Sequence, residues 1–405
     1  MEMSQVEQKE FDTQWEILSQ GVFEITPENE FKKMLAHSIM SKKPLRVKCG
    51  IDPTLSDIHL GHIIPYKKMR QFQDLGHIGV VVIGDYTAQI GDPSGKNESR
   101  VALTKEVVKK NAAEYMGQLF TVLDKNKTEI RYQSEWFEKV SLAEIMSWAA
   151  ETTMAKLLSH ETFSNRIEQN LSLGLHEMFY PVLQGMDSVF IHADVELGGS
   201  DQKFNVLMGR DYQKHRGTRP QAAILLPLIM GLDGAQKMSK SLGNFIAIRD
   251  EAFDKFGKVM SIPDSLMENY AQYVAGFSIS ERQDFLNGLK NQTLHPNEAK
   301  KILATNIVAF FHGEEVANAM REQFERVFAQ KKIPDEMENF SFSSGMSLVE
   351  ILVKSGLCDS NADAKRMITQ NAVSVVDGEK LQKIDQIIDA SFENKILKVG
   401  KRRFV

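Results

Sequence analysis

Cysteine is scarce in this chain, and long uninterrupted apolar runs are absent. The 405 residues include only Cys49 and Cys358, and neither belongs to a Cys-x-x-Cys pair. This pattern gives neither a disulfide framework nor zinc-ligand spacing, so no metal site is predicted and a reducing compartment is favoured. The longest apolar stretches, residues 80–83 and 222–230, are far shorter than the roughly 20 residues of a membrane-spanning helix.

A strong excess of one charge is also lacking. The net charge is -5, with 25% charged and 42% hydrophobic residues, so any RNA contact must come from local basic patches. Residues 1–9 are polar and lack the apolar core of a signal peptide. The sequence therefore predicts a globular protein of roughly two to four domains, without a membrane segment and with a cytoplasmic location.

Residues 45–248 alternate short apolar runs with helical patterns. Residues 45–51 and 79–83 predict buried strands, and residues 63–74 predict a helix that ends before Gly76. A strand, a helix and a strand at this spacing indicate a parallel sheet, with a phosphate site at the carboxyl ends of its strands. Further strands are expected at residues 129–133, 188–191, 195–197 and 223–226, and a helical stretch at about 142–183.

After residue 248 the predicted secondary structure changes twice along the chain. Amphipathic helical patterns fill residues 250–334, and a Ser-rich segment that contains Gly345 predicts a linker at 336–345. Residues 346–405 show two short helical patterns, then strands around Asp377-Gly378, a hairpin signal, and a basic end. The predicted fold class is α/β: a Rossmann-like parallel-sheet domain at 1–248 with a helical insertion at about 125–185, an α-helical domain at 249–335, and a small α+β domain at 346–405.

Two short segments carry the most specific chemistry. His59-Leu60-Gly61-His62 lies where the strand at 45–51 turns into the next helix, and Lys237-Met-Ser-Lys-Ser241 lies on a loop between Gly234 and Gly243. Free backbone N–H groups and the helix dipole at such a junction favour a phosphate, imidazoles donate hydrogen bonds, and the lysines add positive charge. Either segment alone is weak evidence, since nucleotidyltransferases also carry the first and a Lys/Ser run is often a solvated loop.

Together, in this order, the two segments resemble the paired motifs of class I aminoacyl-tRNA synthetases. Further segments resemble the tyrosyl-tRNA synthetases, and they span most of the chain. These are Cys49-Gly-Ile-Asp-Pro-Thr54, Gly91-Asp-Pro-Ser-Gly-Lys96 with Arg100, Tyr180-Pro-Val-Leu-Gln-Gly-Met-Asp187, Gly198-Gly-Ser-Asp-Gln-Lys-Phe-Asn205 and His295-Pro-Asn-Glu-Ala-Lys-Lys301. Residues 346–405 resemble the S-four-type RNA-binding domain of bacterial tyrosyl enzymes.

The resemblance implies activation of L-tyrosine with ATP and Mg²⁺, without a tightly bound cofactor, followed by transfer to a tyrosine-specific tRNA. It assigns the phosphates to Thr54, His59, His62, Lys237 and Lys240, with Lys96 and Arg100 as helpers. It assigns tyrosine to Lys48, Asp92, Tyr180, Gln184, Asp187 and Gln202, with Asp187 accepting from the phenol. It assigns the rest of ATP to Cys49, Gly50, Asp52, Gly61, Gly199, Asp201, Met238, Ser239 and Ser241. RNA contacts are expected at Lys365, Arg366, Lys398, Lys401, Arg402 and Arg403.

The resemblance has departures and leaves alternatives. Lys48 stands where one branch of tyrosyl enzymes has a Tyr that contacts the phenol, although Lys is usual in a second bacterial branch. Met154, Leu157, Leu158 and Phe163 fit either an internal core, which periodicity favours, or the homodimer contact of the family. A tryptophanyl synthetase, a non-catalytic RNA-binding protein on the same scaffold and a small-molecule nucleotidyltransferase are the alternative functions.

Overall fold

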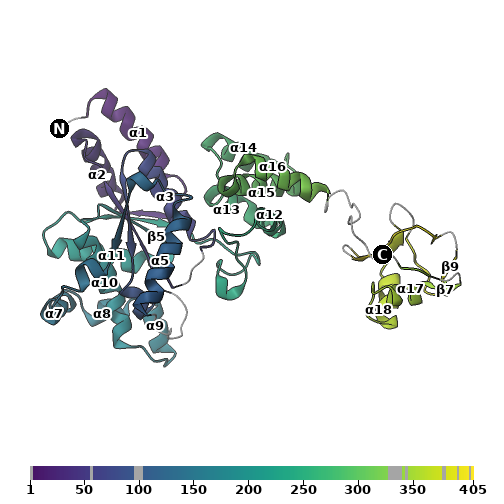
Figure 1. Cartoon of the computed structure of the whole chain (residues 1–405). Coiled ribbons are helices and arrows are strands. Elements are labelled where there is room, and N and C mark those ends of the chain that lie inside the picture. The colour runs from purple at the N-terminus through teal and green to yellow at the C-terminus, as the bar shows by residue number, and fades with distance from the viewer. Residues whose placement is uncertain are drawn as a thin grey trace. The chain divides into compact units, whose positions relative to one another are not determined.

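The computed structural model describes residues 3–54, 58–94, 104–326, 340–342, 345–375, 380–389, 392–400 and 403–405, apart from the side chains of residues 105, 241 and 404. The chain forms two compact units, Met1–Arg321 and Glu322–Val405, each described below by itself. Figure 1 shows the strands of the first unit surrounded by helices.

The first unit is built on a six-stranded sheet in the order β1-β6-β5-β2-β3-β4. Its strands are β1 (Glu24–Thr26), β2 (Arg46–Ile51), β3 (Ile78–Ile83), β4 (Thr128–Tyr132), β5 (Val195–Gly199) and β6 (Ala222–Leu226). Every neighbouring pair is parallel except β1 and β6. The strand order changes direction between β2 and β5, the place where doubly wound sheets bind ligands at the carboxyl ends.

The predicted strand–helix–strand unit is confirmed. Helix α3 (Ile63–Asp74) joins β2 to β3, which pair in parallel with Lys48 opposite Val80. The helix ends at Leu75, and Gly76 follows with φ +92°. Strand β6 is buried along its whole length and β3 along all but its first residue, as expected for parallel strands covered on both faces.

The predicted strand at residues 188–191 is wrong, because these residues end helix α10 (Tyr180–Phe190) and Ile191 is its C-cap. A three-residue apolar run such as 189–191 does not distinguish a strand from the last turn of a buried helix. Helix α10 packs closely on α11 (Lys203–His215), where a Cβ on Gly185 would lie 2.8 Å from Tyr212 Cδ2. This close packing brings residues 184–188 against the sheet.

The remaining helices of the first unit are mostly short. No sequence pattern predicted β1, α1 (Gln5–Ser19), α2 (Glu28–Ser41) or α5 (Lys105–Leu119). The predicted helical stretch at 142–183 is divided into α7 (Leu142–Ala150), α8 (Met154–Leu158), α9 (Glu161–Glu168), the short η2 (Leu175–Phe179) and the start of α10, and α4 (Thr87–Ile90) and α6 (Ser134–Phe137) are single turns. Residues 252–324 contain helices and no strand, as predicted: α12 (Ala252–Ser261), α13 (Met267–Tyr273), α14 (Ile279–Lys290), α15 (Pro296–His312) and α16 (Glu314–Phe324).

The second unit has its own small core. Its elements are β7 (Met346–Ser347), α17 (Leu348–Lys354), α18 (Asn361–Thr369), β8 (Val373–Val375), β9 (Ile387–Ile388), β10 (Leu397–Val399) and β11 (Arg403–Phe404). Leu348, Leu352, Ile368, Val373 and Val399 are fully buried between them. The α+β class predicted for this region is confirmed, whereas the hairpin expected at Asp377-Gly378 lies outside the described residues. The predicted boundary at residue 248 stays a prediction.

Candidate active site

The two short motifs of the sequence meet in the folded chain. The Leu60 N–H donates to the carbonyl of Ile246 at 2.9 Å, and the Ile248 N–H donates to the carbonyl of Ile58 at 2.8 Å. His59 pairs with Ala247 as an isolated antiparallel β-bridge between these bonds. The segment that precedes α3 is therefore tied by backbone hydrogen bonds to the residues that follow the Lys-Met-Ser-Lys-Ser run.

The Lys-Met-Ser-Lys-Ser run is itself held by polar contacts. The Met238 N–H donates to the carbonyl of Ile229 at 2.8 Å, and the Ser239 N–H donates to Asn244 Oδ1 at 2.8 Å. Asn244 Nδ2 donates in turn to Asp233 Oδ2 at 2.8 Å. Asn244 and Asp233 were not predicted to support this loop. Both lie close to it in sequence, but Asn and Asp are common in any turn.

Gly61 lies between side chains of the two motifs. A Cβ at this position would lie 3.2 Å from the His59 ring and 3.8 Å from the Met238 Cβ. Met238 is only 5% exposed, so it packs inside the site and its side chain is not a surface one. Glycine at position 61 therefore leaves the space above the paired motifs open for a ligand.

The two histidines of the first motif stack on each other, with ring centroids 3.6 Å apart and an interplanar angle of 19°. His59 is buried, and its Nδ1 has no hydrogen-bond partner among the described residues. Burial, followed by the neighbouring His62 and the positive charge of Lys240, lowers the pKa of His59 to about 2. His59 is therefore a neutral imidazole at physiological pH and acts as a hydrogen-bonding group without charge.

Positive charge comes from the second motif. Lys237 Nζ lies 3.3 Å from Asp201 Oδ2, and the lysine side chain is half exposed. Asp201 follows Gly199 at the carboxyl end of β5, where a Cβ on Gly199 would lie 2.6 Å from Asp201 Oδ1. Lys240 begins the short helix η4 (Lys240–Leu242). The predicted residues Lys96 and Arg100 lie outside the described residues, and so does the side chain of Ser241.

Asp187 is a buried carboxylate held by two side chains. Its Oδ2 accepts from Gln133 Nε2 at 2.8 Å, and its Oδ1 accepts from Trp136 Nε1 at 3.2 Å. Burial raises the pKa of Asp187 to about 7, and the charge of Lys48 opposes this rise. Gln133 and Trp136 were missed by sequence reasoning. Their signal was available, because Gln133 is the last residue of the predicted strand at 129–133 and Trp136 follows three residues later, at the carboxyl end of that strand.

Tyr180 is connected to the turn after β2. Its hydroxyl donates to Asp52 Oδ2 at 3.0 Å, and Asp52 Oδ1 accepts from Thr87 Oγ1 at 2.6 Å. Burial, and then the negative charge of Asp52, raise the pKa of Tyr180 well above its ordinary value. A Cβ on Gly84 would lie 2.1 Å from Asp52 Oδ1, so only glycine leaves room for this carboxylate. Asp52 was predicted to lie beside the nucleotide or the substrate carboxylate. Its carboxylate also connects the turn after β2 to Tyr180 on α10 and Thr87 on α4.

Asp92 and Gln202 are brought together as the sequence predicted. Gln202 Nε2 donates to Asp92 Oδ2 at 2.7 Å, while the Ser94 N–H and Oγ both donate to Asp92 Oδ1 at 2.8 Å. Asn205 Nδ2 donates to Gln202 Oε1 at 3.1 Å. A carboxylate and an amide oxygen are therefore fixed beside the carboxyl end of β5, as an ammonium group requires.

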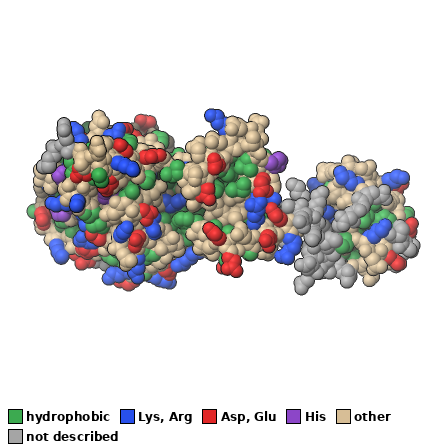
Figure 2. Space-filling model, turned by 90° about the horizontal axis from the view of Figure 1, so that it is seen from above, with side chains coloured by type: hydrophobic (Ala, Val, Ile, Leu, Met, Phe, Trp, Pro, Cys, Tyr) green, Lys and Arg blue, Asp and Glu red, His purple; other side chains and the backbone are tan. Residues whose placement is uncertain are grey.

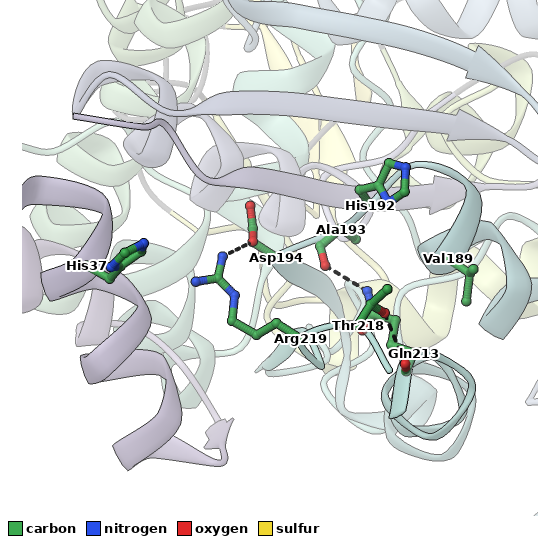
Figure 3. Close-up of a pocket in the computed structure, with 8 residues that line it drawn as sticks. All are labelled: His37, Val189, His192, Ala193, Asp194, Gln213, Thr218 and Arg219. Carbon is green, nitrogen blue, oxygen red and sulfur yellow. Dashed lines mark hydrogen bonds and ion pairs between the residues drawn. The ribbon is translucent and has the colours of Figure 1, made fainter. Parts of the chain in front are cut away.

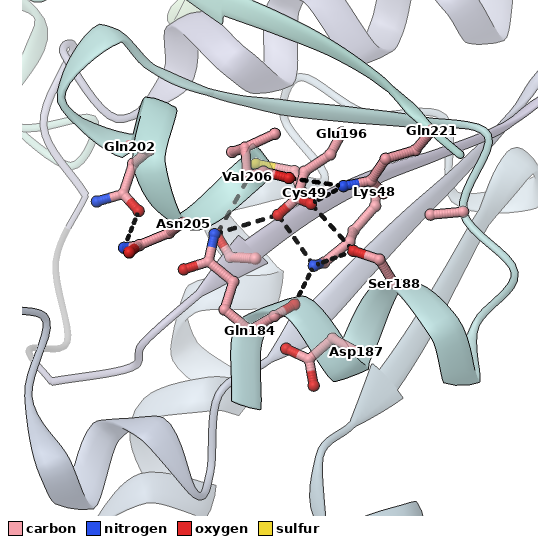
Figure 4. A network of polar contacts seen from close by, with 12 residues as sticks. Lys48, Cys49, Gln184, Asp187, Ser188, Glu196, Gln202, Asn205, Val206 and Gln221 are labelled. Carbon is pink, nitrogen blue, oxygen red and sulfur yellow. Dashed lines mark hydrogen bonds and ion pairs between the residues drawn. The ribbon is translucent and has the colours of Figure 1, made fainter. Parts of the chain in front are cut away.

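Lys48 lies deeper than the other predicted pocket residues. Its side chain is fully buried, and its Nζ lies 2.8 Å from the carbonyl of Gln184, 2.8 Å from Ser188 Oγ and 2.9 Å from Glu196 Oε1. Figure 4 shows these groups converging between the sheet and α10. The next residue, Cys49, is buried too, and burial raises the pKa of its thiol to about 12.

The strand end and the following turn are more open. A Cβ on Gly50 would meet no heavy atom within 4 Å, and this residue is exposed. The Thr54 N–H donates to the carbonyl of Asp52 at 2.7 Å, which closes the turn after β2. Gly50 and Thr54 therefore border open space at the carboxyl end of the sheet.

The second unit exposes several of the predicted RNA-contacting residues. Lys365 and Arg366 are exposed on α18, where Arg366 pairs with Asp363 at 2.5 Å. Lys398 is half-buried on β10, and Arg403 Nη1 donates to the carbonyl of Leu357 at 2.6 Å. Lys401 and Arg402 lie outside the described residues. On the face of the first unit seen in Figure 2, acidic and basic side chains are interspersed.

A surface pocket lies elsewhere on the first unit, near the amino ends of β5 and β6 (Figure 3). It is lined by His37, Val189, His192, Ala193, Asp194, Gln213, Thr218 and Arg219. None of these is a predicted site residue. Within the described part of the chain, no group of three or more His, Cys, Asp or Glu side chains is arranged to hold a metal ion. Over the same part, no helix combines the length and apolar character needed to cross a membrane.

Comparison with known proteins gives matches over almost the whole chain. Residues 40–329 match the family described as tRNA synthetases class I (W and Y), and residues 328–405 match the tyrosine–tRNA ligase SYY-like C-terminal domain. The chain is 44% identical over 398 residues to the tyrosine–tRNA ligase of Moorella thermoacetica, covering 98% of this chain and 96% of that protein. It is 45% identical over 390 residues to that of Idiomarina loihiensis, covering 96% of each.

Solved structures share the fold. A tyrosyl-tRNA synthetase from Archaeoglobus fulgidus, complexed with L-tyrosine, superimposes with a TM-score of 0.62 at 20% identity and covers 77% of this chain and 99% of its own. A C-terminally truncated mitochondrial tyrosyl-tRNA synthetase from Aspergillus nidulans superimposes with a TM-score of 0.63 at 20% identity, covering 78% and 94%. At these identities the likeness is one of fold.

Proposed function

The chain belongs to the tyrosine–tRNA ligases of the class I aminoacyl-tRNA synthetases, and on this premise we propose how its own residues carry the reaction. The enzyme activates L-tyrosine with ATP to tyrosyl-adenylate and transfers the tyrosyl group to the terminal adenosine of its tRNA. The residue assignment is best supported by the backbone hydrogen bonds between residues 58–60 and 246–248, which tie the segment that contains His59 to the residues after the Lys-Met-Ser-Lys-Ser run.

In the first step the tyrosine carboxylate attacks the α-phosphorus of ATP in line, and pyrophosphate leaves with the electrons of the broken P–O bond. A carboxylate is already ionised at neutral pH, so this step needs no general base. The barrier is therefore lowered by positioning and by charge placed where the phosphoryl oxygens become more negative. We assign the charge to Lys237 and Lys240, which lie on the loop that meets the first motif.

The histidines have a different part from the lysines. Because His59 is neutral and buried, it donates a hydrogen bond to a phosphoryl oxygen without adding charge. We assign His62 and Thr54 to the same side of the triphosphate, with Lys96 and Arg100 as helpers. Magnesium enters with the phosphates of ATP, since oxygen ligands from substrate phosphates are typical for this ion.

The nucleoside part of ATP is proposed to lie over Gly61 and against Gly199. Asp201 accepts from the ribose hydroxyls, and its present partner Lys237 moves to the phosphates when ATP binds. Gly50 borders this space and has room beside its Cα. Met238 and Cys49, both buried, contribute apolar walls near the paired motifs. The backbones of Asp52, Ser239 and Ser241 complete the nucleotide-binding set.

Tyrosine is proposed to lie between α10 and the carboxyl ends of the strands. Its phenol donates to Asp187, which Gln133 and Trp136 hold in place. Phenylalanine is rejected because it would leave the buried Asp187 without its phenol partner, and a buried polar group without a partner is costly. The substrate ammonium is received by oxygens of Asp92, Gln184 and Tyr180, with Gln202 orienting Asp92.

The tRNA contacts and the dimer are also proposals. In the second unit, Lys365, Arg366, Lys398, Lys401, Arg402 and Arg403 are assigned to RNA phosphates, which basic side chains position without reading sequence. A homodimer is supported by exposed apolar side chains between residues 142 and 190: Leu142, Met146, Met154, Ile167, Leu171, Leu175 and Phe190. Four residues were predicted to belong either to the core or to the dimer contact. Leu157 and Phe163 are buried in the core, Leu158 is half-buried, and Met154 is 54% exposed. A translation enzyme of this kind is expected in the cytoplasm.

A paired substitution tests the site. The double variant His59→Ala/Lys237→Ala is expected to lose tyrosyl-adenylate formation while it still retains tRNA on a filter, because tRNA binds largely elsewhere. Circular dichroism of the purified variant controls for folding. Adenylate formation at the wild-type rate would contradict the assignment of the paired motifs. Loss of tRNA retention with intact adenylate formation would move these residues to an RNA-binding role.

A further inference from the structure

A fully buried ion pair lies beneath the tyrosine pocket. Lys48 on β2 and Glu196 on β5 are neighbours across two parallel strands, with side chains 0% and 1% exposed and Nζ 2.9 Å from Oε1. Removing two charges from water is costly, and such a pair is often no more stabilising than apolar residues of the same size. Stability alone therefore does not explain why Lys48 and Glu196 are buried beside the proposed pocket, which points to a functional role.

Both members of the pair hold helix α10. Lys48 Nζ donates to the backbone carbonyl of Gln184 and to Ser188 Oγ, each at 2.8 Å. Ser188 Oγ donates to Glu196 Oε2 at 3.0 Å, and Gln184 Nε2 donates to Glu196 Oε1 at 3.1 Å. Gln184 and Ser188 are one helical turn apart, so they present the same face of α10 to the pair.

The residue before β6 completes the surroundings of Glu196. Gln221, which precedes β6, donates through Nε2 to Glu196 Oε2. Gly209 on α11 leaves the space for this contact, since a Cβ there would lie 2.6 Å from Gln221 Nε2 and 2.8 Å from Ser188 Oγ. Ser188 and Gln221 thus occupy Oε2, and Oε1 is left to Lys48 and Gln184.

We propose that Lys48 and Glu196 are positioning residues that fix the orientation of the Gln184 amide for the α-ammonium of tyrosine. An ionised carboxylate only accepts hydrogen bonds, so the NH₂ group of Gln184 must face Glu196. The amide oxygen is then turned away from Glu196, and no hydrogen bond recorded among the described residues occupies it. That oxygen is the acceptor that an ammonium needs.

This inference rests on the proposed contact between Gln184 and the substrate ammonium. It gives Lys48 an indirect role: the ammonium of Lys48 forms an ion pair with Glu196, and its three N–H donors are matched by three protein acceptors. A direct contact of Lys48 with the substrate phenol would require one of these bonds to break. Lys48 and Glu196 touch no substrate atom in this account.

The test uses two inhibitors that differ only by the ammonium: tyrosinol and desamino-tyrosinol. A single Glu196→Gln change would leave the Lys48 ammonium buried without its partner and risks unfolding. The test variant is therefore Lys48→Met/Glu196→Gln, which removes both charges and keeps both volumes. In this variant the residue at 196 can donate to or accept from Gln184, so the amide is free to turn over.

The inhibition constant of tyrosinol in tyrosine-dependent pyrophosphate exchange is expected to rise at least about tenfold in the double variant, the scale of one hydrogen bond to a charged group. The inhibition constant of desamino-tyrosinol is expected to stay within about twofold, because it has no ammonium to lose a contact. Equal weakening of both inhibitors would show a merely structural role and overturn the inference. Unchanged binding of both would overturn it as well.

Two further variants separate the possible failures. Gln221→Leu removes a donor from Glu196 but leaves the carboxylate facing Gln184, so it should keep the wild-type preference for tyrosinol; loss of that preference would overturn the inference. Gln184→Met should lose the preference. If Gln184→Met keeps the preference for tyrosinol, the proposed contact of Gln184 with the substrate ammonium is wrong, and the proposed role of Lys48 and Glu196 is wrong as well. If Gln184→Met loses the preference while the double variant keeps it, only the inference is wrong.

Discussion

Replacing Asp187 by asparagine is expected to make the sheet-containing unit more stable at pH 8 while it abolishes tyrosine activation. The pKa of Asp187 is raised from 3.8 to about 7, mainly by burial. The folded state therefore holds this proton more tightly than the unfolded state, and the contribution of Asp187 to stability falls as the pH rises from 3.8 to about 7. Asparagine carries no charge and lacks this dependence.

The size of the effect follows from the two pKa values. A difference of roughly 3 pH units, at about 1.4 kcal/mol each, is on the order of 4 kcal/mol, of which about 3 kcal/mol falls between pH 5 and pH 8. The asparagine side chain offsets part of the stability that the variant gains at high pH. Gln133 and Trp136 both donate to position 187, so the NH₂ group of asparagine faces one donor without a hydrogen bond, at a cost of about 1–3 kcal/mol that does not depend on pH.

The assay is urea unfolding of the wild type and Asp187→Asn at pH 5 and pH 8, followed by tryptophan fluorescence. The chain has three tryptophans, Trp15, Trp136 and Trp148, and all lie in the Met1–Arg321 unit, so the signal reports that unit. The stability of the variant relative to the wild type should increase by about 3 kcal/mol from pH 5 to pH 8. A relative stability that is the same at both pH values would refute a carboxyl with a raised pKa at position 187.

Three other variants probe separate parts of the account. Lys237→Ala should lower kcat for adenylate formation about a hundredfold with little change in KM for tyrosine, because it removes a positive charge from beside the leaving pyrophosphate. Stopped-flow measurement of adenylate formation tests this, and a change in KM alone would contradict it. Leu175→Glu places a charge on a side chain that is 70% exposed in the apolar region of the proposed dimer, and light scattering should then give half the wild-type mass; an unchanged mass would place the contact elsewhere. Lys365→Ala should weaken tRNA retention and reduce its salt slope by about 1, with pyrophosphate exchange measured on the same sample as the folding control; an unchanged slope would exclude a phosphate contact at Lys365.

Apolar runs and helical periodicity in the sequence predicted individual strands and helices of the sheet-containing unit. The strand at 45–51, the helix at 63–74 and the strand at 79–83 differ from the structure by at most one residue at any end. Their alternation required a parallel sheet, which the register of Lys48 opposite Val80 confirms. The strand expected at 188–191 failed because a short apolar run has no periodicity of its own.

Contacts between distant segments could not be predicted in the same way. The bridge of His59 to Ala247 depends on the path of the whole chain between them, and no local pattern encodes it. Apart from their place at the end of a predicted strand, nothing in the local sequence marks Gln133 and Trp136 as site residues, because their role depends on α10, which places Asp187 within hydrogen-bonding distance of both side chains. Lys48 illustrates the same limit: position alone suggested a substrate contact, whereas Glu196, the partner that occupies its ammonium, became visible only in the folded chain.

The decisive measurement of amino-acid specificity is the exchange of labelled pyrophosphate into ATP, run with each of the twenty amino acids in turn. Exchange with tyrosine alone is expected, because Asp187 requires a phenol and the paired motifs require ATP. Exchange with tryptophan would mean that the pocket around Asp187 has been misassigned on a correct fold. Absence of exchange from well-folded protein would contradict the proposed chemistry of the paired motifs.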